Sequence, residues 1–567
     1  MMRRKQDRFL SVSFFALLFM LACLIALKDN SLAGALTASI SGSVMDQHGP
    51  VAGAKVRIQG MEEFVVTDKA GLFVIPAAPA GKAFRISAWK RGYYSTLLKN
   101  VHAPKDGICL KLIPYQIFDN DRYDWIPPVG SKKSCVECHP AITEMSLQDP
   151  HMLAARNPRF LTLYYGTDMK GNQSPLTRYK KGGSINLWAN TMVPLPPDLS
   201  APYYGPGYLL DFPGTVGNCT LCHIPGASIA NSVDPRAVKG ADRFGVHCDF
   251  CHKIEDVHVG KATGMPYSMN PGVQAMSVRR PFKGDSQRPQ LFFGTFEDVN
   301  ADAGDTNLPL LGESRYCASC HFGVFWNTVI YNSYGEWLKS PYADLTSGKA
   351  KTCQACHMPS PTMYKGRALT NIAPGKGGIE RTPARIHNHN MTVDTRLLRN
   401  SLSMKVLAKI SDGKARIEVT LTNDRTGHHI PTDSPLRHLI LLVAAKDSRG
   451  AALRQLSGHQ LPDWCGSDKA RNGHYAGHPG KAYAKILANK WNNEYPTAAY
   501  WDHTEIVSDN RLAALTSDTS TYTFEPPRSG RIEITVTLLY RRAFIKLMEQ
   551  KKWDVPDIVM ACRKLAI

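Results

Sequence analysis

The sequence predicts a multidomain protein with a β-sandwich at each end and a mainly α-helical or irregular region between them. Short stretches of alternating apolar residues occupy positions 36–115 and return after residue 400, as expected for strands. Residues 125–398 are rich in Gly and Pro and show weak helical periodicity, yet they contain ten of the 14 cysteines. At 567 residues the chain is too long for one core, so we expect three or four domains.

The first 35 residues form the predicted signal peptide or anchor. Four basic residues precede the apolar stretch 9–27, and small residues follow at 31–35. This order favours a signal cleaved near Ala33. A retained anchor stays open, because the stretch is just long enough to cross a bilayer. In either version the chain is exported to the periplasm or beyond the cell, and membrane contact is confined to that anchor.

Residues 36–115 are predicted to form the first β-sandwich. Five short strands are expected, separated by turns that contain Gly or Pro: 38–44, 54–58, 64–67, 72–76 and 84–88. The pattern resembles the carboxypeptidase-regulatory-like β-sandwich, with glycines where that family has them, at Gly42, Gly53, Gly71 and Gly92. The resemblance implies a spacer or a docking surface, without a catalytic set.

Five copies of Cys-x-x-Cys-His dominate the middle region. They are Cys135-Val-Glu-Cys138-His139, Cys219-Thr-Leu-Cys222-His223, Cys248-Asp-Phe-Cys251-His252, Cys317-Ala-Ser-Cys320-His321 and Cys353-Gln-Ala-Cys356-His357. Composition alone would give about 0.01 such motif in this chain. Each motif is typical of c-type haem attachment, in which the cysteines form thioethers and the histidine is an axial ligand of the iron. A zinc ribbon would also use Cys-x-x-Cys pairs, but it would not require a histidine after every pair.

The five motifs together predict five covalently bound haem c groups, with the polypeptide of residues 125–398 wrapped around a haem-packed core. The region resembles the multihaem c-type cytochromes, most closely those of the c-554 type. The resemblance covers about residues 130–400 through the motifs, and 400–545 more loosely.

Histidines outside the motifs are candidates for the second axial position of each iron. The resemblance implies distal ligands at His151, which follows the first motif, at His387 and His389, which follow the last, and at His428 in Gly427-His428-His429-Ile430-Pro431-Thr432. His247 and His258, which flank the third motif, are weaker candidates. A surface or core histidine is the alternative for each of them.

The fourth motif departs from this pattern. Tyr342 stands where a histidine is expected in the segment that follows it. Its haem therefore takes a ligand from elsewhere in the chain, has a vacant face or is bound by the tyrosine. The plainest interpretation of Tyr342 is a packing residue.

Residues 400–567 are predicted to form a second β-sandwich closed by a helical tail. Strands are expected at 403–410, 415–422, 439–445 and 531–539, and the tail at 543–552. Another helix is expected at 325–338, within the haem region. Cys465 and Cys562 could form a disulfide, but two free thiols are equally compatible with the sequence.

The function that these features favour is electron transfer between redox proteins of the cell envelope, with an extracellular acceptor as one end point. We expect an electron carrier rather than a catalyst. The net charge of +20 suits acidic partners or an anionic envelope surface, and nucleic acid is not an expected partner outside the cytoplasm. One alternative is a reductase that acts on a small nitrogen or sulfur oxyanion at one open haem, and another is a surface or filament-forming cytochrome.

Overall fold

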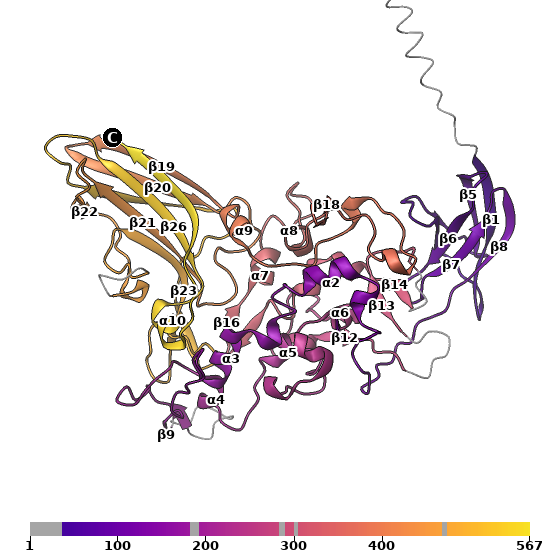
Figure 1. The fold of residues 1–567 in the computed structure, drawn as a ribbon, viewed down its shortest axis with the longest axis horizontal. Coiled ribbons are helices and arrows are strands. Elements are labelled where there is room, and N and C mark those ends of the chain that lie inside the picture. Colours follow the sequence, from indigo (N-terminus) through magenta and orange to yellow (C-terminus); the bar gives the residue numbers. More distant parts are fainter. Residues whose placement is uncertain (1–36, 182–191, 283–289, 300–303, 468–472) are drawn as a thin grey trace, which may run out of the picture. The chain divides into compact units, whose positions relative to one another are not determined.

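The computed structural model describes residues 37–181, 192–282, 290–299, 304–467 and 473–567 (Figure 1). The described chain divides into two compact units, which are treated separately. One contains the residues up to Tyr115 together with Phe296–Asn307, and the other contains Gln116–Thr295 and Leu308–Ile567. The predicted signal or anchor at 1–35 lies outside the described residues. Within the described ranges, no helix is long and apolar enough to span a bilayer.

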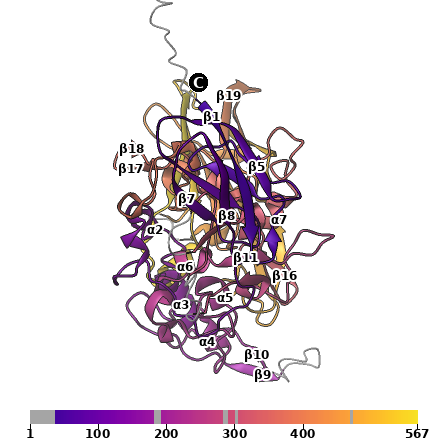
Figure 2. The ribbon, with the colours of Figure 1, turned by 90° about the vertical axis from the view of Figure 1, so that its right-hand side faces the viewer.

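The first unit consists mainly of two four-stranded sheets. In one sheet β1 pairs with β2, β5 and β8, and the other has the order β4-β3-β6-β7 (Figure 2 shows several of these strands). The strands are β1 (Thr37–Asp46), β2 (Gly49–Pro50), β3 (Lys55–Ile58), β4 (Val65–Val66), β5 (Leu72–Pro79), β6 (Phe84–Trp89), β7 (Thr96–Val101) and β8 (Lys105–Lys111). All five predicted segments contain a strand, whereas β2, β7 and β8 were not predicted.

The inner faces of these sheets supply one apolar cluster. Ile40, Val56 and Ile86 are fully buried in it. Gly42 has a steric reason to be glycine, because a Cβ atom there would lie 2.1 Å from the carbonyl oxygen of Ile108 on β8. The parallel pairing of β1 with β8 therefore depends on the missing side chain.

The C-terminal part of the second unit is a sandwich of a four-stranded and a five-stranded sheet. Their orders are β19-β20-β25-β22 and β24-β23-β21-β26-β27. The strands are β19 (Ser403–Ser411), β20 (Lys414–Thr422), β21 (His438–Lys446), β22 (Gln455–Ser457), β23 (Gly480–Asn489), β24 (Thr504–Asp509), β25 (Ser517–Phe524), β26 (Glu533–Arg541) and β27 (Ile558–Ala566). The alternation predicted along β26 is present, since Ile534, Val536 and Leu538 face the core.

Two predicted helices are wrong in part. The C-terminal segment is not a helical tail: α10 (Ile545–Lys551) is followed by β27, which pairs with β26 and ends the described chain. The segment 325–338 forms a hairpin of β15 (Gly323–Phe325) and β16 (Thr328–Tyr331) before α7 (Ser333–Leu338). Residues with positive φ at Trp326 and Asn327 make the tight turn that stops a helix there. Cys465 and Cys562 are both free thiols.

The motif-bearing region is built from short helical turns and two-stranded hairpins rather than from a mainly helical core. The longer helices there are α2 (Pro140–Ser146) and α3 (Pro158–Tyr165). The remaining short elements are α4 (Tyr208–Asp211), β9 (Tyr179–Lys181), β10 (Met192–Pro194), β11 (Ile254–Val257), β12 (Met276–Val278), β13 (Phe292–Gly294), β17 (Met363–Tyr364), β18 (Arg367–Ala368) and α9 (Thr395–Arg399), with β14 (Asp305–Asn307) in the first unit. The irregular chain expected around a cofactor core is therefore observed.

Candidate haem-binding site

Each Cys-x-x-Cys-His motif begins on, or ends in, a short helical turn. These turns are η1 (Cys135–Glu137), α5 (Thr220–His223), α6 (Cys248–Cys251), η7 (Ser314–Cys317) and α8 (Cys353–His357). A helical turn places residues three apart on the same face, so both thiols are directed to one side where the turn contains both cysteines, as in α6 and α8. This is the local geometry that two thioether bonds to one haem edge require.

Thiols from different motifs lie next to one another. A hydrogen bond with Cys248 of the third motif, together with burial, raises the pKa of Cys135. Equivalent hydrogen bonds raise the pKa of Cys222 through Cys320, and that of Cys317 through Cys353. The fourth motif therefore adjoins the second and the fifth, and the first adjoins the third.

The third and fourth motifs are joined by a further hydrogen bond. The hydroxyl of Tyr316, directly before the fourth motif, donates to the carbonyl oxygen of Cys251 at 2.7 Å. Together with the thiol contacts, this bond connects all five motifs in one branched arrangement. The fourth motif is the branch point, because it contacts the second, the third and the fifth.

Three of the five motif histidines have a second histidine ring opposite them. His252 and His389 have ring centres 6.5 Å apart and planes 19° apart. The corresponding values are 6.2 Å and 16° for His357 and His428. The rings of His321 and His151 are 6.0 Å and 63° apart.

These separations fit a metal ion held between two imidazoles. A metal–imidazole bond is about 2.0–2.1 Å long and the ring nitrogen lies about 1.1 Å from the ring centre, which places the two ring centres about 6.2–6.4 Å apart. The three observed distances fall close to that range. The residues present therefore fit bis-histidine haem ligation at the third, fourth and fifth motifs.

Hydrogen bonds hold most of these rings through the Nδ1 atom. His252 bonds to the carbonyl oxygen of Phe293 at 2.6 Å, His389 to that of His387 at 2.9 Å and His428 to that of His429 at 2.9 Å. His139 of the first motif bonds in the same way to the carbonyl oxygen of Ile372 at 3.0 Å. An engaged Nδ1 fixes the tautomer and directs Nε2 to a metal.

Burial keeps several of these imidazoles neutral, which is the form that binds a metal. It lowers the pKa of His223, His357 and His389 to about 4 in each case. His321 differs: although burial opposes the shift, the charge of Asp433 and a hydrogen bond to it raise the pKa of His321 to about 9.

The first and second motifs have no second histidine opposite them among the described residues. His387 bonds through Nδ1 to the carbonyl oxygen of Met358 at 2.9 Å, and no described ring contact joins it to His139. His223 stacks on Phe160 with ring centres 4.1 Å apart, and its buried Nδ1 has no hydrogen-bond partner in the described chain. The first and second motifs are therefore the places where no second histidine faces the motif histidine in the described chain, and at the second motif Phe160 stacks on His223 instead.

The two weaker candidates make other contacts in the described chain. His247 is fully buried, where its Nδ1 accepts a hydrogen bond from the Phe250 N–H at 3.2 Å and its Nε2 lies 3.4 Å from Asp242. His247 thus caps α6 and has neither nitrogen left for a metal. His258 is exposed and its Nε2 lies 2.9 Å from the Ser277 hydroxyl. We omit both from the ligand sets proposed below.

Tyr342 is accounted for as a packing residue. Its hydroxyl donates to the carbonyl oxygen of Asp424 at 3.3 Å. The histidine opposite His321 comes instead from His151, far away in the sequence.

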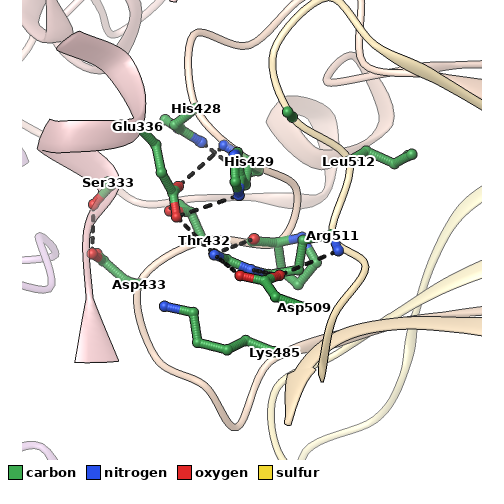
Figure 3. Close-up of polar contacts among 12 residues, drawn as sticks. Ser333, Glu336, His428, His429, Thr432, Asp433, Lys485, Asp509, Arg511 and Leu512 are labelled. Carbon is green, nitrogen blue, oxygen red and sulfur yellow. Dashed lines mark hydrogen bonds and ion pairs between the residues drawn. The ribbon is translucent and has the colours of Figure 1, made fainter. Parts of the chain in front are cut away.

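One loop of the C-terminal sandwich places side chains beside the histidines of two motifs. The loop Gly427–Asp433 places His428 opposite His357 and Asp433 beside His321, where the Asp433 carboxylate lies 3.1 Å from Nδ1. Figure 3 shows the buried ion cluster that holds this loop. Glu336 on α7 accepts hydrogen bonds from the backbone of His429 and the hydroxyl of Thr432, and pairs with Arg511 at 2.9 Å.

Arg511 completes this cluster from the sandwich side. It pairs with Asp509 at 2.7 Å and donates to the carbonyl oxygen of Pro431 at 3.2 Å. Glu336, Arg511, Asp149 and Asp433 are not among the site residues that the sequence predicts. Only Asp149, two residues before His151, and Asp433, directly after the Gly-His-x-x-Pro-Thr segment, have a local signal that could have found them.

Comparison with known proteins gives a likeness to solved structures. No protein-family model matches the chain, and no curated protein matches it. A penta-heme cytochrome c552 from Thermochromatium tepidum has a similar structure, with a TM-score of 0.50 and 18% identity over 76% of this chain and 97% of that one. A type II cohesin–X-dockerin complex from Acetivibrio cellulolyticus and the human F-spondin reeler domain have TM-scores of only 0.13 and 0.12, at 21% and 12% identity.

The last two likenesses cover 14% and 30% of this chain, and 58% and 96% of the other chains, and carry no argument at those scores. Among the described residues, no group of three or more His, Cys, Asp or Glu side chains is arranged to hold a bare metal ion. The likeness to the penta-heme protein, at its level of identity, concerns the fold alone: over 76% of its length this multidomain chain has a fold similar to that of the penta-heme cytochrome c552.

Proposed function

We propose that the chain is an exported pentahaem c-type cytochrome that transfers electrons between redox partners of the cell envelope. The observation that carries the proposal is the pairing of His252, His321 and His357 with second histidines at ring separations of 6.0–6.5 Å. Two histidines on one iron leave no position for a substrate, so such a centre exchanges electrons only.

The proposed ligand sets follow from these pairs. Cys248 and Cys251 would hold one haem, with His252 and His389 as the histidines that would bind its iron. Cys317 and Cys320 would hold another with His321 and His151, and Cys353 and Cys356 a third with His357 and His428. Cys135, Cys138 and His139 hold another haem, for which His387 is the predicted distal ligand. Cys219, Cys222 and His223 hold the fifth. When bound, these haems supply one-electron redox chemistry.

The polypeptide has a defined part in this function. The backbone carbonyls at Phe293, His387 and His429 orient the imidazoles, and the bond from the Tyr316 hydroxyl to the carbonyl oxygen of Cys251 ties the fourth motif to the third. The excess of basic residues gives the surface a positive charge, which favours acidic redox proteins or an anionic envelope surface as partners. Export and the extracellular acceptor are parts of the proposal that the signal-like sequence supports.

A second candidate function is reduction of a small nitrogen or sulfur oxyanion at the second motif. It is favoured by one observation, the absence of a second histidine opposite His223 in the described chain. An axial position without a protein ligand can accept a small molecule. All five motifs end in His, which distinguishes this chain from pentahaem nitrite reductases whose catalytic motif ends in Lys.

The spin state of the purified holoprotein separates the two functions. For an electron carrier, the EPR and optical spectra are dominated by six-coordinate low-spin haem, and added cyanide, nitrite or hydroxylamine leaves these low-spin signals unchanged. A high-spin component that binds these ligands, and that His223→Ala perturbs, would replace the carrier with the reductase. A protein whose haems are all high-spin would contradict the ligand sets.

A further inference from the structure

The His151–His321 pair differs from the other facing pairs in what holds its rings. Nδ1 of His321 lies 3.1 Å from a carboxylate oxygen of Asp433, and Nδ1 of His151 lies 2.9 Å from a carboxylate oxygen of Asp149. Both imidazoles at the fourth motif therefore have a carboxylate as hydrogen-bond acceptor.

The rings at the third motif provide the contrast within the same molecule. His252 and His389 both bond to backbone carbonyl oxygens, those of Phe293 and His387. At the fifth motif, His428 also bonds to a carbonyl oxygen, its neighbour's. Of the three pairs, the pair at the fourth motif is thus the one in which both imidazoles bond to a carboxylate.

Both carboxylates are fixed in place by other parts of the chain. Asp149 is 2% exposed and accepts hydrogen bonds from the backbone N–H groups of His151 and Met391. Asp433 accepts a hydrogen bond from the hydroxyl of Ser333, at the start of α7. These contacts hold each carboxylate beside its histidine, so neither acceptor is a mobile surface side chain.

The acceptor at Nδ1 controls how strongly an imidazole donates electrons through Nε2. A carboxylate draws the Nδ1 proton more strongly than a carbonyl does, which gives the ring imidazolate character and stabilises the oxidised metal. On the basis of the proposed function, we propose that Asp149 and Asp433 are positioning residues that give the haem at Cys317 and Cys320 a lower reduction potential than the haem at Cys248 and Cys251.

The position of the fourth motif among the others gives this difference in reduction potential a consequence for electron transfer. Cys320 and Cys317 contact the second and fifth motifs, and Tyr316 contacts the third. A low-potential centre at this junction lies between the second motif, which has no facing histidine in the described chain, and the third and fifth motifs. The two carboxylates would therefore set the reduction potential of the haem through which electrons pass between these sites.

The test is a spectroelectrochemical titration of the holoprotein and of Asp433→Asn, Asp149→Asn and the double variant. Asparagine keeps the shape and an acceptor oxygen but removes the charge. His151→Met marks the wave of the fourth motif, because a thioether ligand raises the potential. Asp168→Asn is the matched control: Asp168 is equally buried and accepts backbone hydrogen bonds from Lys170 and Asn172, without touching a histidine.

The expected result is that each single variant moves one wave of the five, the one that His151→Met marks, to higher potential. The double variant should move it further, the control should move none, and the EPR signal of one low-spin haem should change with the wave. Unchanged waves in a folded protein with intact bis-histidine spectra would overturn this inference and leave the proposed function standing. If a variant fails to fold, its partner single variant gives the same test, and loss of haem from the unmodified protein would instead refute the proposed function.

Discussion

Glu336→Gln provides a sharp test of how the C-terminal sandwich supports the haem region. Glu336 and Arg511 have side chains only 4% exposed and form an ion pair at 2.9 Å. Removing one partner of a buried ion pair costs about 3–5 kcal/mol, because it leaves a buried charge uncompensated. Arg511 keeps its pairing with Asp509 at 2.7 Å, so we expect the lower end of that range, about 3 kcal/mol.

The assay is guanidinium denaturation of the holoprotein followed by far-UV circular dichroism, with the spin state measured in parallel. The backbone of His429 and the hydroxyl of Thr432 bond to the same carboxylate, so the loop that carries His428 should loosen and the haem of the fifth motif should gain high-spin character. Glu525→Gln is the matched control. Its ion pair with Arg454 has side chains 56% and 71% exposed, and such pairs contribute about 0–1 kcal/mol. A loss below about 1 kcal/mol for Glu336→Gln, equal to that of the control, would refute the reasoning.

Three further substitutions test other parts of the account. His389→Ala should turn one haem high-spin, seen by EPR, because the ring 6.5 Å from His252 is lost, and an unchanged spectrum would remove His389 from the ligand set. His247→Ala should lower the free energy of unfolding by about 1 kcal/mol through loss of the helix cap, while every haem stays in its original spin state; a new high-spin signal would make His247 a ligand after all. Leu538→Ala removes a fully buried side chain from the sandwich core and should cost about 2–5 kcal/mol in the same assay, and a cost near zero would place Leu538 outside the core.

The sequence identified the features that have local signals. The Cys-x-x-Cys-His motifs need only five consecutive residues, and the alternation of Ile534, Val536 and Leu538 follows from the two-residue period of a strand. The helix predicted at 325–338 is wrong in its first half because positive φ at Trp326 and Asn327 makes a turn there. Asn is enriched in this conformation but Trp is not, so the pair gave only a weak turn signal. The strand β27 was missed because it is an exposed edge strand with mixed residues.

The pairing of ligands could not be read from the sequence, because it depends on tertiary structure. His151 lies near the first motif in the chain but faces His321 of the fourth, and His428 reaches His357 from the C-terminal sandwich. Asp433 is 112 residues from the histidine that it contacts. Such contacts are decided by how distant segments pack, so residue spacing alone could suggest the candidates but not their partners.

The central claim, covalent haem at five places in this polypeptide, is tested most directly by the intact mass of the protein purified from a host that matures c-type cytochromes. The account predicts a mass that exceeds the polypeptide by five haem groups, retained after denaturation and reduction. A mass equal to the bare polypeptide would contradict the account at its foundation.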